Sequence, residues 1–366
     1  RFNGLWYKIF KRIFFFKKII MESQPLVSII IVNLNRKKEL TKCIESINFQ
    51  NYKNFEILLI DNNSDDGSIE SIKSKFTNTL IYKTSKNLGT SYTRNAGVNF
   101  SNGELIWFLD SDTYLSDENV LLNLVTKFLI NSEIDAIGGE AIINEKNQVL
   151  GTKKLVLYPN GMTKGYLDNS DIKNKVEVLA TCNLMIRKKT IEDVGGFDHF
   201  YFFYLEDLDL TYRVFKEGYK MQLIEKCPVI HYFSEKSRFK NHFQAKKNRI
   251  YFIIKNFSIL NILFLPIYDL VYLLNFDNLN RIYKKLFQDK KLENKNFKIM
   301  PKKFSITNVV YTIKISLITV ISMLFSYIYI PYYLIKYFSH RKIKINFLDL
   351  INNEDFIIIN KRTDIK

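Results

Sequence analysis

The chain has 366 residues and a mass of 43.4 kDa, enough for one large domain with additional segments. Its formal net charge of +17 calls for an anionic partner, and nucleic acid or an anionic membrane are the two common ones. Because the sequence contains no zinc-finger, RNP or basic-zipper signature, it predicts no nucleic-acid partner. Basic residues alternate with aromatic and aliphatic ones in residues 1–20 and 236–303, which suits the cytoplasmic face of a bilayer.

The cysteine pattern and the first residues indicate the compartment. Cys43, Cys182 and Cys227 are odd in number and widely spaced, so the sequence predicts neither a disulfide framework nor a structural zinc site. A reducing cytosol is therefore favoured. Residues 1–24 form a basic arm, for which an amphipathic helix in the membrane interface and an irregular arm are alternatives of equal weight. Charges interrupt the apolar run, so this arm does not resemble a cleavable signal peptide.

From Pro25 onward, apolar runs that suit buried strands alternate with segments that suit helices. The strands are predicted at residues 26–32, 55–60, 79–83 and 105–109. The helices are predicted at residues 37–49, 68–76, after Asn87-Leu88-Gly89, and 118–131. This alternation predicts right-handed crossovers and a mostly parallel sheet flanked by helices.

The next hundred residues are less regular. Strands are predicted at 134–143, 148–157 and 176–187, with a polar loop at 158–175. A sharp turn is predicted at Val194–Asp198, and an amphipathic helix at 208–218 that ends at Gly218.

Beyond residue 235 the character of the sequence changes. Residues 236–303 are predicted to be a basic linker with interfacial helices, because their apolar segment carries Pro266 and Asp269. Residues 315–335 contain 21 residues without a charge. Since about 20 such residues cross a bilayer, one transmembrane helix is predicted within 304–340, followed by a C-terminal tail at 341–366. An amphipathic hairpin lying in the interface is the alternative.

Acidic residues stand directly after three of the apolar runs: Asp61, the pair Asp110 and Asp112, and the pair Glu206 and Asp207. In parallel sheets, ligands bind at the carboxyl ends of the strands. Two carboxylates two residues apart can ligate one divalent cation, which can in turn hold a diphosphate. A carboxylate such as Asp61 could accept from the N–H edge of a nucleobase. The pattern therefore indicates an enzyme site for a cation and a phosphate-bearing ligand.

Six motifs occur in order: Val27–Asn33, Leu59–Gly67, Asn87–Gly97, Phe108–Asp112, Gly195–Asp198 and Tyr204–Leu210. Together they resemble the family 2 glycosyltransferases of the GT-A fold, and most of all the rhamnosyltransferase-like members. The resemblance implies an α/β GT-A fold over residues 25–235, with a nucleotide-binding half at 25–133 and an acceptor half at 134–235. A helical, membrane-associated region is expected to follow it.

The resemblance also implies the chemistry. We expect a hexosyltransferase-type enzyme that uses a UDP-, dTDP- or GDP-sugar and Mg²⁺ or Mn²⁺, and inverts the anomeric carbon in a single displacement. Asp207 is the expected base, with Glu206 and Asp209 as rivals. Glu206 is expected to bind the acceptor or orient the loop, and Asp209 to cap its helix or pair with Arg213.

The expected site residues fall into three groups. Donor-binding residues are expected to be Val32, Asn33, Asn35, Asp61, Asn63, Asn87, Arg94, Asp110 and Ser111. Acceptor-binding residues are expected to be Gly196, Phe197 and Asp198, and metal ligands Asp110, Asp112 and His231. Three structural alternatives remain open: an ordinary salt bridge for Arg94, a structural role for His231, and a purely structural turn at Gly195-Gly196.

The whole pattern predicts transfer of one sugar to a glycan or polyprenyl-linked acceptor at the cell membrane, with the catalytic domain in the cytoplasm, in assembly of cell-surface polysaccharide or glycan. The only tryptophans are Trp6 and Trp107, so the Gln-x-x-Arg-Trp motif of processive family members is absent and single addition is favoured. A non-catalytic, membrane-anchored scaffold that binds nucleotide sugars is one alternative. A sugar-1-phosphate nucleotidyltransferase is another, but the glycine-rich loop it needs after the first strand is missing.

Overall fold

The computed structural model describes residues 24–143, 155–157, 160–165, 177–232, 242–274, 320–340 and 346–360. The chain forms two compact units. The first unit consists of residues 1–157, 163–234 and 344–366. The second unit consists of residues 158–162 and 235–343. Nearly all of the predicted basic arm and residues 148–154 of one predicted strand lie outside the described residues.

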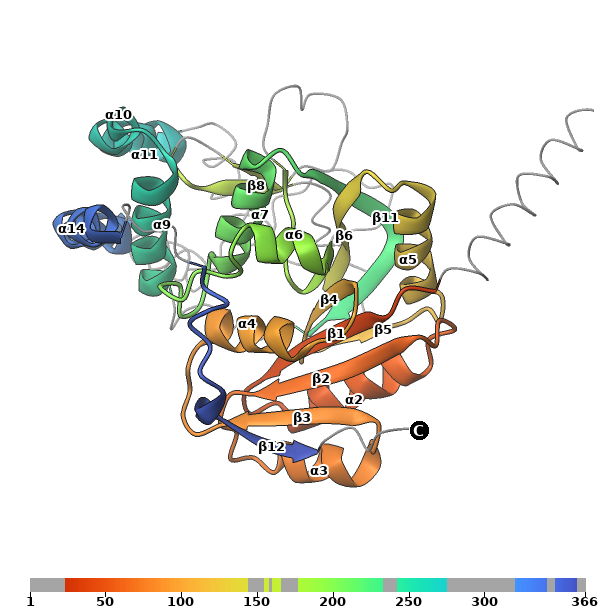
Figure 1. Ribbon diagram of the computed structural model, residues 1–366. Coiled ribbons are helices and arrows are strands. Elements are labelled where there is room, and N and C mark those ends of the chain that lie inside the picture. Colours follow the sequence, from red (N-terminus) through yellow and green to blue (C-terminus); the bar gives the residue numbers. More distant parts are fainter. Residues whose placement is uncertain are drawn as a thin grey trace, which may run out of the picture. The chain divides into compact units, whose positions relative to one another are not determined.

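A nine-stranded sheet forms the centre of the first unit (Figure 1). Its strands, in spatial order, are β12 (Phe356–Asn360), β3 (Thr79–Thr84), β2 (Phe55–Asp61), β1 (Val27–Asn33), β4 (Leu105–Asp110), β10 (Asn183–Arg187), β6 (Ile134–Ile143), β11 (Lys220–His231) and β5 (Thr113–Leu115). Strands β3, β2, β1 and β4 run parallel, as do β6 and β11, whereas β12, β10 and β5 are antiparallel to their neighbours. The predicted mostly parallel α/β sheet is confirmed. Three short strands, β7 (Leu155–Leu157), β8 (Thr163–Gly165) and β9 (Glu177–Val178), form a separate small sheet.

Helices cover both faces of the large sheet. On one face lie α2 (Lys37–Asn48), α3 (Ser68–Lys75) and α5 (Val120–Ile130). On the other lie α4 (Thr90–Phe100), α6 (Lys188–Asp193) and α7 (Glu206–Lys216). Helix α7 ends just before Gly218, which has a φ of +84°, as the predicted glycine cap requires.

The central strand β1 shows why the sheet forms where the sequence predicts it. Ile29 and Ile31 are fully buried in the core on one face, and Ile30 is fully buried in the core on the other. A strand covered on both faces can be apolar at successive positions. Helix α4 comes especially close to this strand, because a Cβ at Gly97 would lie 2.4 Å from a side-chain methyl of Ile30.

The C-terminal segment returns to the first unit after the second unit is complete. Strand β12 pairs antiparallel with β3 at the edge of the sheet. Before it, the Phe347 N–H donates to the Gly195 carbonyl at 2.8 Å. A C-terminal tail is predicted at residues 341–366, and this edge strand is not predicted from the sequence.

The second unit is mainly helical in the residues that the structure describes. Its helices include α9 (His242–Asn256), α10 (Ile259–Leu263), α11 (Leu265–Leu274) and α14 (Ile330–His340). Residues 320–326 are also helical and lead through a 3₁₀ turn, Tyr327–Tyr329, into α14. Contacts join α9 to α10 and to α14.

The predicted transmembrane helix lies partly outside the described residues, because 304–319 are not among them. In the parts of the chain that the structure does describe, every helix is either too short or too polar to cross a bilayer.

The close approach at Gly97 gives a test of the fold. We expect Gly97→Ala to lower the free energy of unfolding by about 1–3 kcal/mol, because the added methyl must displace Ile30 in a packed core. Chemical denaturation followed by the fluorescence of the buried Trp107 measures it. Asn99→Ala, an exposed change on the same helix, is the control and should stay within about 0.5 kcal/mol of wild type. Equal stability of the two variants would contradict the packing described.

Candidate active site

The ends of three adjacent parallel strands bring the predicted donor-site residues together. In the register of the sheet, Asn33 at the end of β1 is opposite Asp61 at the end of β2, and Val32 is opposite Asp110 at the end of β4. The predicted carboxylates therefore share one edge of the sheet, where parallel sheets bind their ligands.

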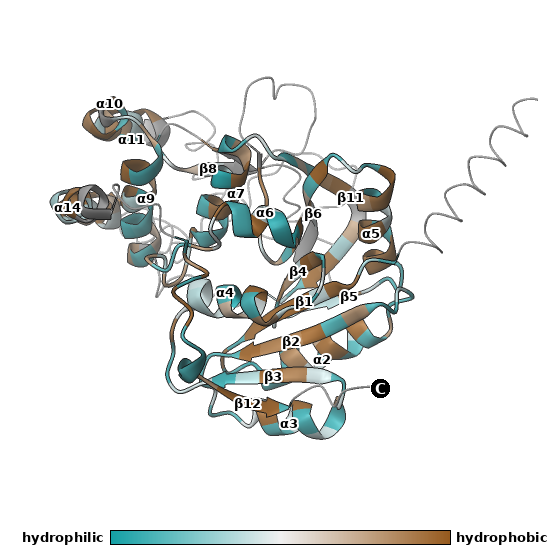
Figure 2. Cartoon of the chain, viewed as in Figure 1, coloured by the Kyte–Doolittle hydropathy of each residue, from teal (hydrophilic) through white to brown (hydrophobic). Residues whose placement is uncertain are grey.

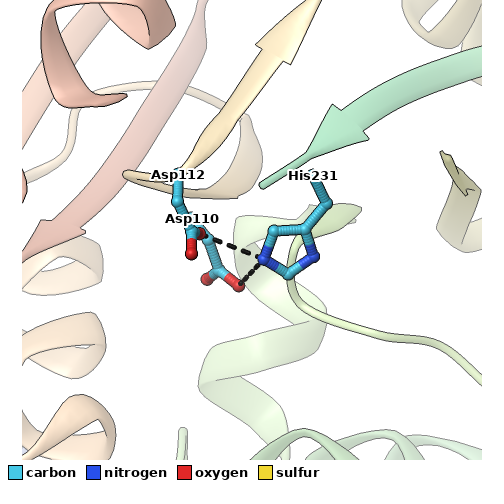
Figure 3. A group of neighbouring side chains, drawn as sticks. All are labelled: Asp110, Asp112 and His231. Carbon is cyan, nitrogen blue, oxygen red and sulfur yellow. Dashed lines mark hydrogen bonds and ion pairs between the residues drawn. The ribbon is translucent and has the colours of Figure 1, made fainter. Parts of the chain in front are cut away.

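Asp110, Asp112 and His231 form a compact cluster at this edge (Figure 3). The His231 Nε2 atom is 3.0 Å from an Asp112 carboxylate oxygen and 3.8 Å from one of Asp110. One ligand atom from each residue lies within 4.8 Å of the others. Two carboxylates and an imidazole suit Mg²⁺ or Mn²⁺, so the donor set fits the predicted cation.

The charge state of His231 is coupled to this cluster. Burial by itself would lower the pKa of the imidazole, but the hydrogen bond to Asp112 and the charge of Asp110 raise that pKa to about 11. The ring thus holds a proton between the carboxylates. Because a histidine binds metal only when neutral, a cation bound here would replace that proton.

Arg94 connects the two carboxylate groups of the site. Its guanidinium, on α4, is almost fully buried and donates to Glu206 at 2.6 Å and to Asp110 at 2.9 Å. These two negative charges outweigh the effect of burial and raise the pKa of Arg94 further. Arg94 thus forms the salt bridges of the alternative, and its contact with the nucleotide stays a prediction.

The start of helix α7 presents Glu206 and Asp207 to the site. The two residues before it, Tyr204 and Leu205, have φ angles of +73° and +67°. Left-handed backbone at non-glycine residues costs roughly 1–3 kcal/mol each and is concentrated at functional sites. Here it turns the chain so that both carboxylates lie in the first helical turn, where the helix dipole favours negative charge.

Asp207 is poised between its charged and neutral forms. Desolvation and the neighbouring Glu206 charge raise its pKa, while Arg94 opposes them, and the result is a pKa of about 7. The side chain is only partly buried, so it stays accessible to a ligand. Its rival Asp209 is fully buried and pairs with Arg213 at 2.8 Å, which confirms the expected pairing.

Asp61, a predicted nucleotide-binding residue, is fully buried and hydrogen-bonded to neighbouring residues of the protein. Its carboxylate accepts from the Asn33 side chain at 2.9 Å and from the Ser64 N–H at 2.8 Å. The Asn33 Oδ1 atom is buried and has no hydrogen-bond partner in the described structure. A direct contact between Asp61 and the nucleotide stays a prediction, and the described contacts are those of a residue that orders the turn.

The other predicted donor residues lie around the same edge. Asn35 and Asn63 are exposed and adopt positive φ angles, and Ser111 is buried beside the metal-site carboxylates. Asn87 accepts at 2.7 Å from the side chain of Asn62, which ties the loop before α4 to the end of β2.

The predicted acceptor residues form a buried turn. Phe197 and Asp198 are fully buried, and Asn95 holds both the N–H and the carbonyl of Phe197. Arg213 donates to the Gly196 carbonyl. These contacts favour the structural alternative, and direct contact with an acceptor stays a prediction.

Arg36 is a site residue that the sequence analysis does not identify. It forms an ion pair with Asp112, with 2.9 Å between the guanidinium and carboxylate atoms. The one feature of the sequence that could have indicated Arg36 is its position directly after the strand end Asn33-Leu-Asn35.

Comparison with known proteins gives a consistent class. Residues 28–195 match the protein-family model described as glycosyl transferase family 2, and residues 163–240 match one described as the N-terminal domain of galactosyltransferase. Glycosyltransferase AglE of Haloferax volcanii is 27% identical over 202 residues, which cover 54% of this chain and 64% of that protein. Over these residues the chain is similar to family 2 glycosyltransferases.

Two further proteins extend the comparison. The dolichyl N-acetyl-alpha-D-glucosaminyl phosphate 3-beta-D-2,3-diacetamido-2,3-dideoxy-beta-D-glucuronosyltransferase of Methanococcus voltae is 27% identical over 212 residues, or 53% of this chain and 63% of that protein. The chain thus spans less than two thirds of the length of either relative. The mannosyltransferase PcManGT of Pyrobaculum calidifontis, solved with GDP-Man and Mn²⁺, matches with a TM-score of 0.50 over 88% of both chains at 12% identity, which shows a shared GT-A-like fold.

The metal cluster gives a direct test. We expect Asp112→Asn and His231→Ala each to weaken Mn²⁺ binding by more than about tenfold, because each removes one of three converging ligands. Isothermal titration calorimetry with the purified protein measures it. Glu118→Gln, a change of an exposed carboxylate outside the cluster, is the control. If Asp112→Asn and His231→Ala bind Mn²⁺ as tightly as the control, the cluster is not the cation site.

Proposed function

We propose that the first unit transfers one sugar from a nucleotide-diphosphate sugar, with UDP, dTDP or GDP as the nucleotide, to a hydroxyl group of a glycan or lipid-linked acceptor, with inversion at the anomeric carbon. One observation carries the proposal. Arg94 joins Asp110 of the cation cluster to Glu206, the immediate neighbour of Asp207, so the donor-side and acceptor-side carboxylates form one site. The family 2 match over residues 28–195 supports nucleotide-sugar chemistry.

The cation cluster would hold Mg²⁺ or Mn²⁺ through Asp110, Asp112 and His231. A bound divalent cation supplies Lewis-acid stabilisation of the diphosphate leaving group, which gains negative charge as its bond to the sugar breaks. The Mn²⁺ and GDP-Man in the PcManGT complex support this assignment. Arg94 sits next to Asp110 and adds positive charge on the same side.

Asp207 is the proposed general base. In a single displacement, the acceptor oxygen forms a bond to the anomeric carbon while the bond to the diphosphate oxygen breaks. The carboxylate of Asp207 takes the proton of the acceptor hydroxyl. A pKa near 7 suits this work, because the group is a stronger base than an ordinary aspartate and is still ionised in a useful fraction at neutral pH.

Glu206 has a different proposed role. One of its oxygens is held by Arg94 and by the Thr90 hydroxyl, so that oxygen is not available as a base. The other oxygen is buried without a hydrogen-bond partner in the described structure. A sugar hydroxyl that donates to this oxygen would satisfy it, so Glu206 is proposed to orient a sugar.

The proposed acceptor and location rest on one relative and on the composition of the second unit. The Methanococcus voltae relative is named for a dolichyl-phosphate-linked acceptor, and this chain carries a strongly basic, apolar second unit. We therefore place the reaction at the cytoplasmic face of the cell membrane, on a polyprenyl-type or growing glycan acceptor, in assembly of a cell-surface glycan.

The proposed base is tested by Asp207→Asn with a panel of nucleotide sugars, in Mn²⁺, Mg²⁺ or EDTA. We expect one donor to be turned over by wild type only with metal, and the variant to lose about 10²–10⁴-fold in kcat while still binding that nucleotide. Glu217→Gln, at the exposed end of the same helix, is the control. Nucleotide binding without turnover of any donor, with and without a lipid-linked acceptor, would favour a non-catalytic scaffold.

The pH dependence tests the same residue independently. Because only the ionised carboxylate accepts a proton, kcat/KM should rise with pH along an acid limb well above pH 4, the ordinary region for aspartate. Glu206→Gln should move this limb to lower pH, because it removes the negative charge that raises the pKa of Asp207. An unmoved limb in the variant, or a wild-type limb near pH 4, would contradict the assignment.

A further inference from the structure

The second unit exposes two stripes of large apolar side chains at helical spacing. The α10–α11 stripe consists of Leu260, Leu263, Phe264, Ile267, Leu270 and Val271. The 321–335 stripe consists of Ile321, Leu324, Phe325, Ile328 and Ile335. Positions three, four and seven apart share one face of a helix, so the residues of a stripe that lie on the same helix gather on one side of it. Exposed fractions reach 67% at Leu263 and 73% at Ile335. Figure 2 shows brown, hydrophobic residues within these helices.

Buried polar groups join the same helices to their neighbours. Asp269 of α11 is buried and forms a two-point ion pair with Arg249 of α9, at 2.6 and 2.8 Å. Asn160 and Tyr327 donate hydrogen bonds to the same carboxylate. In a water-facing bundle, the polar residues lie outside and the apolar ones inside. Here the acidic residue and its partners hold the helices together, and the outer face is left to apolar side chains.

The charge of the chain is concentrated in the same region. Residues 235–343 contain twenty Lys or Arg and five Asp or Glu, an excess of fifteen positive charges out of seventeen for the whole chain. Residues 242–274 and 320–340 contain one acidic residue, Asp269. Its charge is paired with that of Arg249. The sequence of this region is therefore suited to an anionic partner.

We infer that the second unit docks on an anionic lipid bilayer through these two stripes. Their apolar side chains enter the boundary between headgroups and acyl chains, and the basic residues meet the lipid phosphates. A basic, strongly amphipathic helix that lies in the interface has this combination of features. A partner protein would cover apolar stripes equally well, but an excess of fifteen positive charges matches an anionic surface. The inference deepens the proposed function, since it gives the surface that would hold the enzyme at a lipid-linked acceptor.

Vesicle flotation with the purified full chain tests this docking. Wild type should float with vesicles that contain about one third phosphatidylglycerol, and much less with pure phosphatidylcholine vesicles. The double variant Leu263→Glu with Ile328→Glu places a carboxylate in the middle of each stripe, and its partition coefficient should fall at least tenfold. Both positions are exposed, so the helices should still fold, and circular dichroism checks that they do.

The matched control changes the net charge equally at another place. Phe49→Glu with Phe215→Glu alters two exposed aromatic residues of the first unit and should bind vesicles like wild type. Equal loss in both double variants would reduce the effect to net charge and overturn the docking role of the stripes. Unchanged binding of the Leu263→Glu, Ile328→Glu variant would also overturn it.

A second copy of the chain is the competing occupant of the stripes. Light scattering in the absence of vesicles separates the two. A dimer that dissociates in the Leu263→Glu, Ile328→Glu variant, with vesicle binding unchanged, would assign the stripes to self-association and overturn the lipid proposal. Flotation measures no sugar transfer, so the proposed reaction can fail while docking holds, and docking can fail while the purified enzyme still turns over its donor.

Discussion

Arg94 sets the constraint on which the site depends. A buried guanidinium requires charged partners, because burial of an unpaired charge is very costly. One partner of Arg94 is Asp110, at the end of a parallel strand. The other is Glu206, at the start of α7 and 112 residues after Arg94 in the sequence. The end of β4 and the start of α7 therefore cannot move apart without leaving the charge of Arg94 exposed or unpaired. The distance between the cation cluster and Asp207 is fixed by the same pair of contacts.

The sequence predicts the parts of the fold that have strong local patterns. Successive isoleucines mark β1 because the strand is covered on both faces, and buried Leu40, Cys43 and Ile44 follow the spacing of a helix in α2. Strand β5 and helix α6 are three and six residues long, too short for a periodic signal. Strand β12 is missed for another reason: its pairing with β3 is set by contacts across most of the chain.

The site shows the same division. Asp110, Asp112 and His231 are predictable because each stands at or just after the end of an apolar strand, and strand ends converge at one edge of a sheet. The partners that the side chains choose are not predictable in this way. Arg36 beside Asp112 depends on how side chains meet across separate elements. The burial of Asp61 likewise depends on the loop that folds over it.

The return of the chain to β3 has a consequence for synthesis. Strand β3 leaves the ribosome early, and its outer edge has no partner until residues 356–360 follow, after the whole second unit. An unpaired strand edge is a template for unwanted pairing with other chains. The last strand of the first unit's sheet is therefore added only after a basic, apolar segment has been translated. A nascent chain held at an anionic bilayer by that segment would be kept apart from its neighbours during this interval.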